Sequence, residues 1–122
     1  MANAMKWPHD LITLADYERR LVHELTAYDR AEYQRERVGN IYRLGHLLGA
    51  KDEAVKIAQE RIDRGQEVLE AFTVAVCEVF TPTRGLHKAL RNCGVTVDVE
   101  RGRWVIPARP ERLALNPNGG AA

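Results

Sequence analysis

Apolar residues recur at alternating intervals of three and four positions from Val55 to Val79, and this seam constrains the fold more than any other feature. Its members are Val55, Ala58, Ile62, Gly65, Leu69, Phe72, Val76 and Val79. Such spacing over nearly four heptads is typical of a helix with one packed stripe. We therefore predict a long helix that begins at an Asp52 cap and ends near Phe80. Within it, Gly65 either permits close approach of another backbone or marks a bend.

A second helical pattern precedes this seam. Thr13 is a suitable N-cap, and Asp16 three residues later forms a variant of the capping box. Apolar residues at helical spacing then continue from Leu14 to Leu48, and Gly49 supplies a stop signal. We expect residues 49–51 to join the two helices as an antiparallel hairpin.

The middle of this first helix carries few apolar side chains. Residues 29–37 read DRAEYQRER, in which Ala31 and Tyr33 are the apolar members. Asp29 and Glu32 form a second possible capping box, so the helix could break there. An unbroken helix and a broken one both remain open at this stage.

The length of the seam bears on oligomeric state. At about 1.5 Å per residue, the second helix would be roughly 40 Å long. One hairpin cannot bury seams of that length, whereas two hairpins can bury them together in a four-helix bundle. We therefore expect a homodimer.

Residues 81–107 predict a different local structure. Thr81 suits the N-cap of a short helix and Pro82 its first position, and the helix should run from about Thr83 to Asn92 and end at Gly94. A β-hairpin should follow, with Arg101 and Gly102 as its turn. That turn pairs Val99 with Trp104 and Val97 with Ile106 on one face, which points Trp104 at the apolar side of the short helix.

These patterns predict a mainly α fold: a long antiparallel, coiled-coil-like helical hairpin, then a short helix and a C-terminal β-hairpin. The chain divides into a flexible N-terminus (1–12), a dimerising helical hairpin (13–80), a basic head (81–107) and a flexible tail (108–122). The tail contains three prolines and two glycines from residue 107 onward and lacks helical periodicity.

The short helix separates basic from apolar residues. One side carries Arg84, His87, Lys88 and Arg91, and the other carries Leu86, Ala89, Leu90 and Cys93. Charge is also divided along the chain, since residues 1–80 hold 11 basic and 14 acidic side chains, and residues 81–122 hold 7 and 3. A helix face without acids, within a basic segment, favours contact with phosphates.

The segment TPTRGLHKALRNCGVTVDVERGRWVIP resembles the recognition helix and wing of winged-helix DNA-binding domains. The resemblance covers residues 81–107 and depends on LRNCGV followed by RGRWVIP. It implies that the basic helix enters the major groove and that the wing touches phosphates. The residues it assigns are Thr83, Arg84, His87, Lys88 and Arg91 on the helix, and Arg101 and Arg103 on the wing.

We therefore expect a small DNA-binding homodimer, in the class of transcriptional regulators, whose partners are itself and double-stranded DNA. The alternative is a non-enzymatic adaptor, assembly factor or inhibitor that binds a protein partner through its helical surface. The apolar residues that would dock such a partner are Ile41, Leu44, Leu47, Leu48, Val55 and Ile57.

Other function classes lack the residues they need. The chain contains no serine, which excludes a serine nucleophile, and no glycine-rich phosphate loop. Its four histidines are scattered, and Cys93 lies opposite His87 on the short helix, so we expect no metal, cofactor or catalytic site. The lack of a long apolar run argues against a membrane partner. With only Cys77 and Cys93 and no signal-peptide pattern, we expect a cytoplasmic location.

Overall fold

The computed structural model describes residues 10–36 and 41–107, apart from the side chains of residues 33–36, 41, 42 and 84. The elements are α1 (Leu14–Glu36), α2 (Ile41–Asp63), α3 (Val68–Val79), α4 (Arg84–Asn92), β1 (Asp98–Glu100) and β2 (Arg103–Val105). Helices followed by an antiparallel two-stranded sheet confirm the predicted fold class. The predicted flexible ends fall almost wholly in residues 1–9 and 108–122, which lie outside this description.

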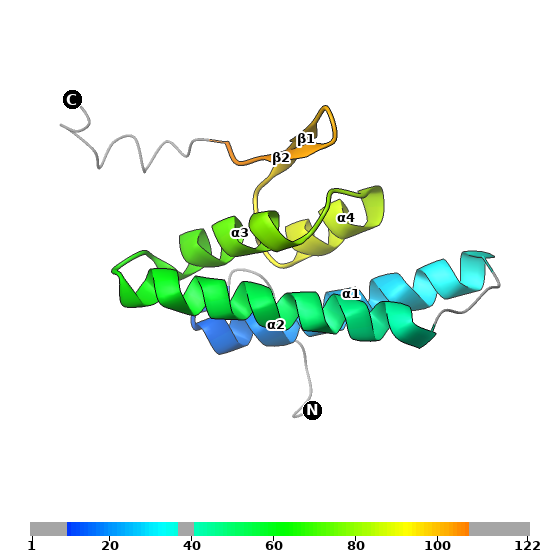
Figure 1. The fold of residues 1–122 in the computed structure, drawn as a ribbon, viewed down its shortest axis with the longest axis horizontal. Coiled ribbons are helices and arrows are strands. Elements are labelled where there is room, and N and C mark those ends of the chain that lie inside the picture. Colours follow the sequence, from blue (N-terminus) through cyan, green and yellow to red (C-terminus); the bar gives the residue numbers. More distant parts are fainter. Residues whose placement is uncertain (1–9, 37–40, 108–122) are drawn as a thin grey trace.

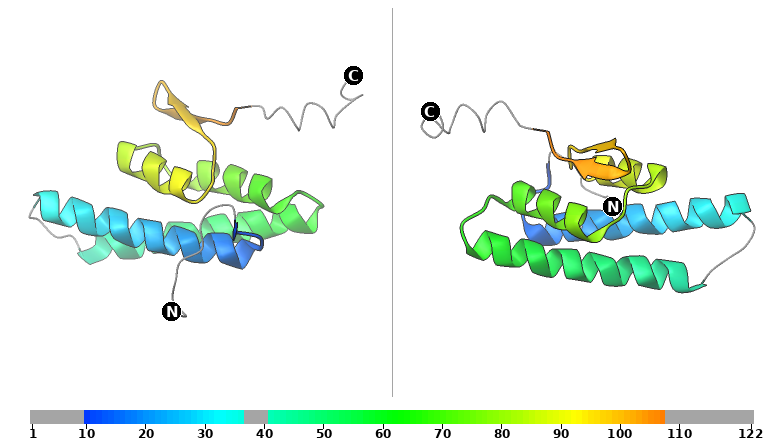
Figure 2. Two further views of the ribbon diagram at one scale, coloured as in Figure 1. Left: turned by 180° about the vertical axis from the view of Figure 1, so that it is seen from behind. Right: turned by 45° about the horizontal axis from the view of Figure 1, so that its top comes forward.

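The elements form two helical layers with the β-hairpin above them. Figure 1 shows α1 and α2 running antiparallel as one layer, with α3 and α4 as the second layer. Across the layers, α2 packs against α3 and α1 packs against α4. The hairpin lies over the α3–α4 layer, on the side away from α1 and α2 (Figure 2).

A single apolar core fills the space between the layers. Its largest fully buried side chains are Leu21, Leu25, Phe72, Val76, Leu90, Cys93 and Val95. They come from α1, α3, α4 and the segment that follows α4. The core reaches Leu11, whose carbonyl accepts a hydrogen bond from the Tyr17 hydroxyl at 3.2 Å. The basic head therefore shares its core with the helical segment.

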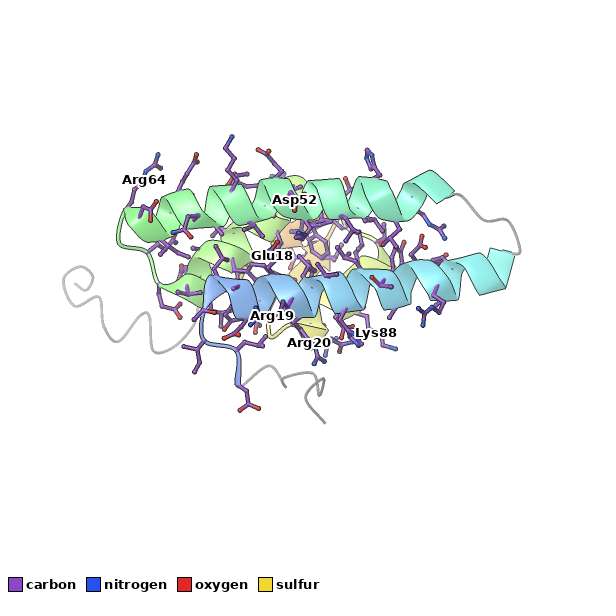
Figure 3. The ribbon with its side chains drawn as sticks, turned by 90° about the horizontal axis from the view of Figure 1, so that it is seen from below. Glu18, Arg19, Arg20, Asp52, Arg64 and Lys88 are labelled. Carbon is purple, nitrogen blue, oxygen red and sulfur yellow. The ribbon has the colours of Figure 1, made fainter. Side chains whose placement is uncertain are left out.

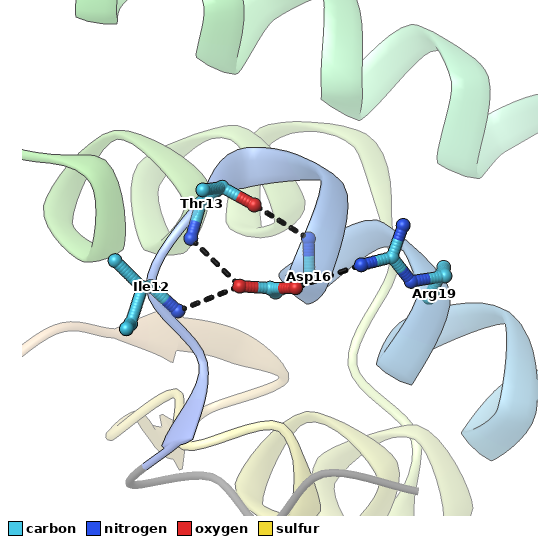
Figure 4. A network of polar contacts seen from close by, with 4 residues as sticks. All are labelled: Ile12, Thr13, Asp16 and Arg19. Carbon is cyan, nitrogen blue, oxygen red and sulfur yellow. Dashed lines mark hydrogen bonds and ion pairs between the residues drawn. The ribbon is translucent and has the colours of Figure 1, made fainter. Parts of the chain in front are cut away.

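The start of α1 confirms the predicted capping box (Figure 4). The Thr13 hydroxyl accepts a hydrogen bond from the Asp16 amide at 3.2 Å, and the Asp16 carboxylate accepts one from the Thr13 amide at 3.0 Å. The same carboxylate accepts from the Ile12 amide and contacts the Arg19 guanidinium. These contacts satisfy backbone donors that a helix N-terminus otherwise leaves unpaired.

The prediction of a hairpin turn at residues 49–51 is wrong. Gly49 lies inside α2, and the chain reverses between Glu36 and Ile41, next to the stretch of few apolar residues. Tertiary packing outweighs the glycine stop signal. Lys51 is buried, and its ammonium contacts the Glu18 carboxylate of α1 at 2.7 Å.

Burial lowers the pKa of Lys51, but hydrogen bonds to Asp52 and Glu18 outweigh that effect and leave the pKa raised. The ammonium therefore stays charged. Asp52 is not a helix cap, because it lies within α2 and its carboxylate contacts Lys51 at 2.5 Å.

The prediction of one helix from Asp52 to Phe80 is also wrong, because Gly65 breaks it. Gly65 has a φ of +101°, a left-handed conformation that favours glycine. Its amide donates to the Ile62 carbonyl at 2.9 Å, and the Gln66 amide donates to the Arg61 carbonyl at 3.0 Å. These two bonds form a Schellman motif, which ends α2 and lets α3 fold back.

The break at Gly65 changes the argument for dimerisation. The two halves of the seam pack against each other within one chain, and Ala58, Phe72 and Val76 are fully buried there. A single chain therefore buries much of the apolar stripe that we expected to require a second copy. The homodimer stays a prediction without that support.

Candidate nucleic-acid interface

Local signals set the position and the exposed side of α4. Thr83, and not the predicted Thr81, is the N-cap, since its hydroxyl accepts from the Leu86 amide at 3.1 Å. At the other end Gly94 has a φ of +88°. The Val95 amide donates to the Leu90 carbonyl, which closes a second Schellman motif.

The apolar side of α4 faces the core, as predicted. Leu86, Ala89, Leu90 and Cys93 are all buried. The opposite side faces solvent, where Lys88 and Arg91 are exposed. The side chain of Arg84 lies outside the described residues.

His87 has a different environment from the other basic residues of α4. Its Nε2 lies 2.8 Å from the Val97 carbonyl, and its ring meets Trp104 edge-on with centroids 5.9 Å apart. The carbonyl can only accept, so Nε2 carries the proton in this contact. His87 therefore links α4 to the hairpin, and its ring is less available to a ligand than the exposed Lys88.

The hairpin confirms the predicted register, with Val99 opposite Trp104 and Glu100 opposite Arg103. Arg101 and Gly102 have φ values of +55° and +75°, as a two-residue turn of the I′ kind requires. Val97 and Ile106 lie just beyond the paired strands. The register therefore follows from the turn and the alternation together.

The indole of Trp104 attaches this hairpin to the helices, because its Nε1 donates to the Phe80 carbonyl at 2.6 Å. Arg101 and Arg103 are exposed, and so are Asp98 and Glu100 on the neighbouring strand. The cations of the tip are therefore flanked by two carboxylates. Arg101, within the turn, lies at the end of the hairpin.

Residues of α1 contribute to this surface in a way the sequence did not reveal. Glu24 and Glu32 line a hollow between α1 and α4 together with Lys88. The Glu24 carboxylate contacts the Arg20 guanidinium at 3.2 Å and accepts a hydrogen bond from the side-chain amide of Asn92 at 2.9 Å. Its charge is thus compensated inside the protein. Figure 3 shows Lys88 beside α1.

Close packing of α4 on α1 depends on Gly85. A Cβ atom at this position would overlap the ring of Tyr28. No local pattern in the sequence predicts this contact, because the two residues are far apart in the chain. A small residue on α4 thus faces an aromatic one on α1.

We expect Gly85→Ala to lower the free energy of unfolding by about 1–3 kcal/mol, because Tyr28 or the helix must move. Gly49→Ala is the matched control, since nothing lies within 4 Å of its added Cβ in α2. Alanine there should stabilise the fold by about 0.5–1 kcal/mol. Urea unfolding followed by circular dichroism measures both, and the same sign for the two variants would contradict the Gly85–Tyr28 contact.

The alternative docking residues all belong to α2, with Ile41 at its start, directly after the chain reversal, and the others further along the helix. Leu47, Leu48 and Ile57 are half-buried and pack against the core, while Leu44 and Val55 are half-buried as well. The side chain of Ile41 lies outside the described residues. The described members of this set are therefore partly used within the fold.

The thiols lie in apolar surroundings. Cys93 is fully buried, and burial raises its pKa to about 12, with Glu24 raising it further and Arg20 opposing. Burial alone raises the pKa of the half-buried Cys77 to about 11. Both thiols are therefore protonated at neutral pH, as expected for packing residues.

Neither a metal-binding cluster nor a membrane-spanning helix occurs within residues 10–36 and 41–107. No three His, Cys, Asp or Glu side chains gather there in an arrangement that could hold a metal ion. In the same ranges, no helix is both long enough and apolar enough to cross a bilayer. Comparison with known proteins found no matching family model, no matching curated protein and no matching solved structure.

Proposed function

We propose that this chain binds double-stranded DNA through the outer side of α4 and the tip of the β-hairpin. The observation that carries the proposal is the pair of exposed cations, Lys88 and Arg91, on a helix that contains no acidic residue. Arg101 and Arg103 add two exposed cations on the adjoining hairpin. Phosphate contacts from such side chains supply most non-specific affinity for DNA.

The connection between helix and hairpin supports the same proposal. Trp104 and His87 hold the hairpin to Phe80 and to α4, so the two sets of cations have a fixed relative position. The chain order also supports it, since α3 with 12 residues is followed by a short turn, α4 and the hairpin. This is the order that the winged-helix resemblance implies, with a short helix before the recognition helix.

Neutralisation of phosphates makes a quantitative prediction for salt dependence. Four exposed cations per chain would give a slope of about −3.6 in a plot of log affinity against log salt. Affinity for a mixed-sequence duplex should then fall about 100-fold between 50 and 200 mM salt. A homodimer with two such surfaces on one duplex would roughly double the slope.

Fluorescence polarisation of a labelled 20-base-pair duplex measures this slope. Light scattering on the same sample gives the oligomeric state, so the slope can be assigned per chain. Saturable binding with a slope near −4 per chain is the expected result. Absence of binding at 50 mM salt would contradict the proposal and favour a protein partner.

A further inference from the structure

The hollow between α1 and α4 has the volume of a small-ligand site and is open to solvent along the exposed residues Ala27, Ala31 and Lys88. Its volume is about 600 Å³, within the range of about 300–1,000 Å³ that such sites occupy. Small residues form its sides, with Ala27 and Ala31 on α1 and Gly85 and Ala89 on α4. Residues four positions apart lie on one face of a helix, so these small side chains together line one slot, next to the Tyr28 ring that packs on Gly85.

The charges around the hollow select the kind of ligand. The Glu24 carboxylate is paired with Arg20 and Asn92, and Glu32 has an interaction partner of its own. Lys88 is exposed at the hollow, and among the described side chains none forms an ion pair with it. A negatively charged group can pair with Lys88 here, whereas a neutral group gains no such contact and a cation is repelled by the ammonium.

We propose that the hollow binds a small aromatic carboxylate. The ring would lie in the slot against the alanines and the ring of Tyr28, where aromatic contacts add to apolar burial. The carboxylate would accept a charge-assisted hydrogen bond from Lys88. Because Lys88 also belongs to the DNA surface, an occupant would weaken duplex binding, and this last step alone rests on the proposed function.

Benzoate, benzamide and benzamidine test the assignment, since they share one ring and differ in charge. Titration of the ¹⁵N-labelled chain with each compound, followed by amide chemical shifts, should show saturable changes at Ala27, Ala31 and Ala89. Benzoate should bind at least fivefold more tightly than benzamide, and benzamidine more weakly than either. Lys88→Gln should remove the preference for benzoate, while Lys56→Gln, an exposed lysine of α2 outside the hollow, should leave it unchanged.

Filling the slot provides a second test. Ala31 is exposed, so Ala31→Leu should fold normally and weaken benzoate binding at least tenfold, and Ala15→Leu on the same helix is its control. Absence of saturable shifts with benzoate, or equal affinity for the three compounds, would overturn the site. If benzoate binds and the duplex does not, the ligand site stands and the DNA proposal fails. If the duplex binds and benzoate does not, the DNA proposal stands and the ligand site fails.

Discussion

Replacing Trp104 by alanine is expected to lower the free energy of unfolding by about 3 kcal/mol. The indole packs against the core, meets the His87 ring edge-on and donates to the Phe80 carbonyl at 2.6 Å. Truncation removes the apolar contacts and leaves the carbonyl of a buried residue without this donor. An unpaired buried acceptor alone costs about 1–3 kcal/mol.

Trp104→Phe separates the two contributions, because it keeps a ring and removes the donor. We expect it to cost about 1–2 kcal/mol, less than the alanine variant. Val99→Ala is the control on the facing strand, where the side chain is exposed and should contribute less than about 0.5 kcal/mol. Urea unfolding followed by circular dichroism compares all three. A Trp104→Ala variant as stable as wild type would show that the indole does not attach the hairpin to the helices.

Local signals in the sequence predicted the parts of the fold that local physics determines. The capping box at Thr13 and Asp16 involves residues three positions apart, and the hairpin register follows from Arg101, Gly102 and the alternation around them. In such cases the interacting groups are neighbours in the chain. Their chemistry is therefore visible without knowledge of the tertiary fold.

The two glycines of the long helices show where this reasoning failed. Gly49 and Gly65 carry the same local signal, yet only Gly65 adopts a positive φ and ends a helix. Gly49 stays helical because the surrounding stretch of α2 packs on α1, with Lys51 contacting Glu18 across the layer. The choice between them depends on contacts between residues 33 positions apart, which no local pattern contains.

Some features of the candidate site could likewise be predicted from the local sequence, and others could not. The basic and apolar sides of α4 follow from helical periodicity, and the burial of Leu90 and the exposure of Lys88 agree with it. The interactions of His87 with Val97 and Trp104 depend on how the hairpin folds back. The approach of Glu24 and Tyr28 depends on α1 crossing α4, so these residues were absent from the predicted site.

Reversing two charges on α4, with Lys88→Glu and Arg91→Glu together, is expected to abolish duplex binding at 50 mM salt, a loss of at least about 100-fold. Both side chains are exposed and neither belongs to the core, so the free energy of unfolding should change by less than about 0.5 kcal/mol per substitution. Any loss of affinity would then result from the changed surface charges and not from unfolding of the protein.

The matched control is Lys56→Glu with Arg64→Glu, which changes one exposed cation within α2 and one directly after its end. It changes the net charge by the same amount, from +1 to −3, and thus matches the loss of long-range attraction. Figure 3 shows Arg64 at one end of the molecule, away from Lys88. The control should therefore weaken binding less than about tenfold and keep a salt slope close to that of wild type. Equal losses in the two double variants would mean that net charge alone governs binding, and the assignment of the interface to α4 would then be wrong.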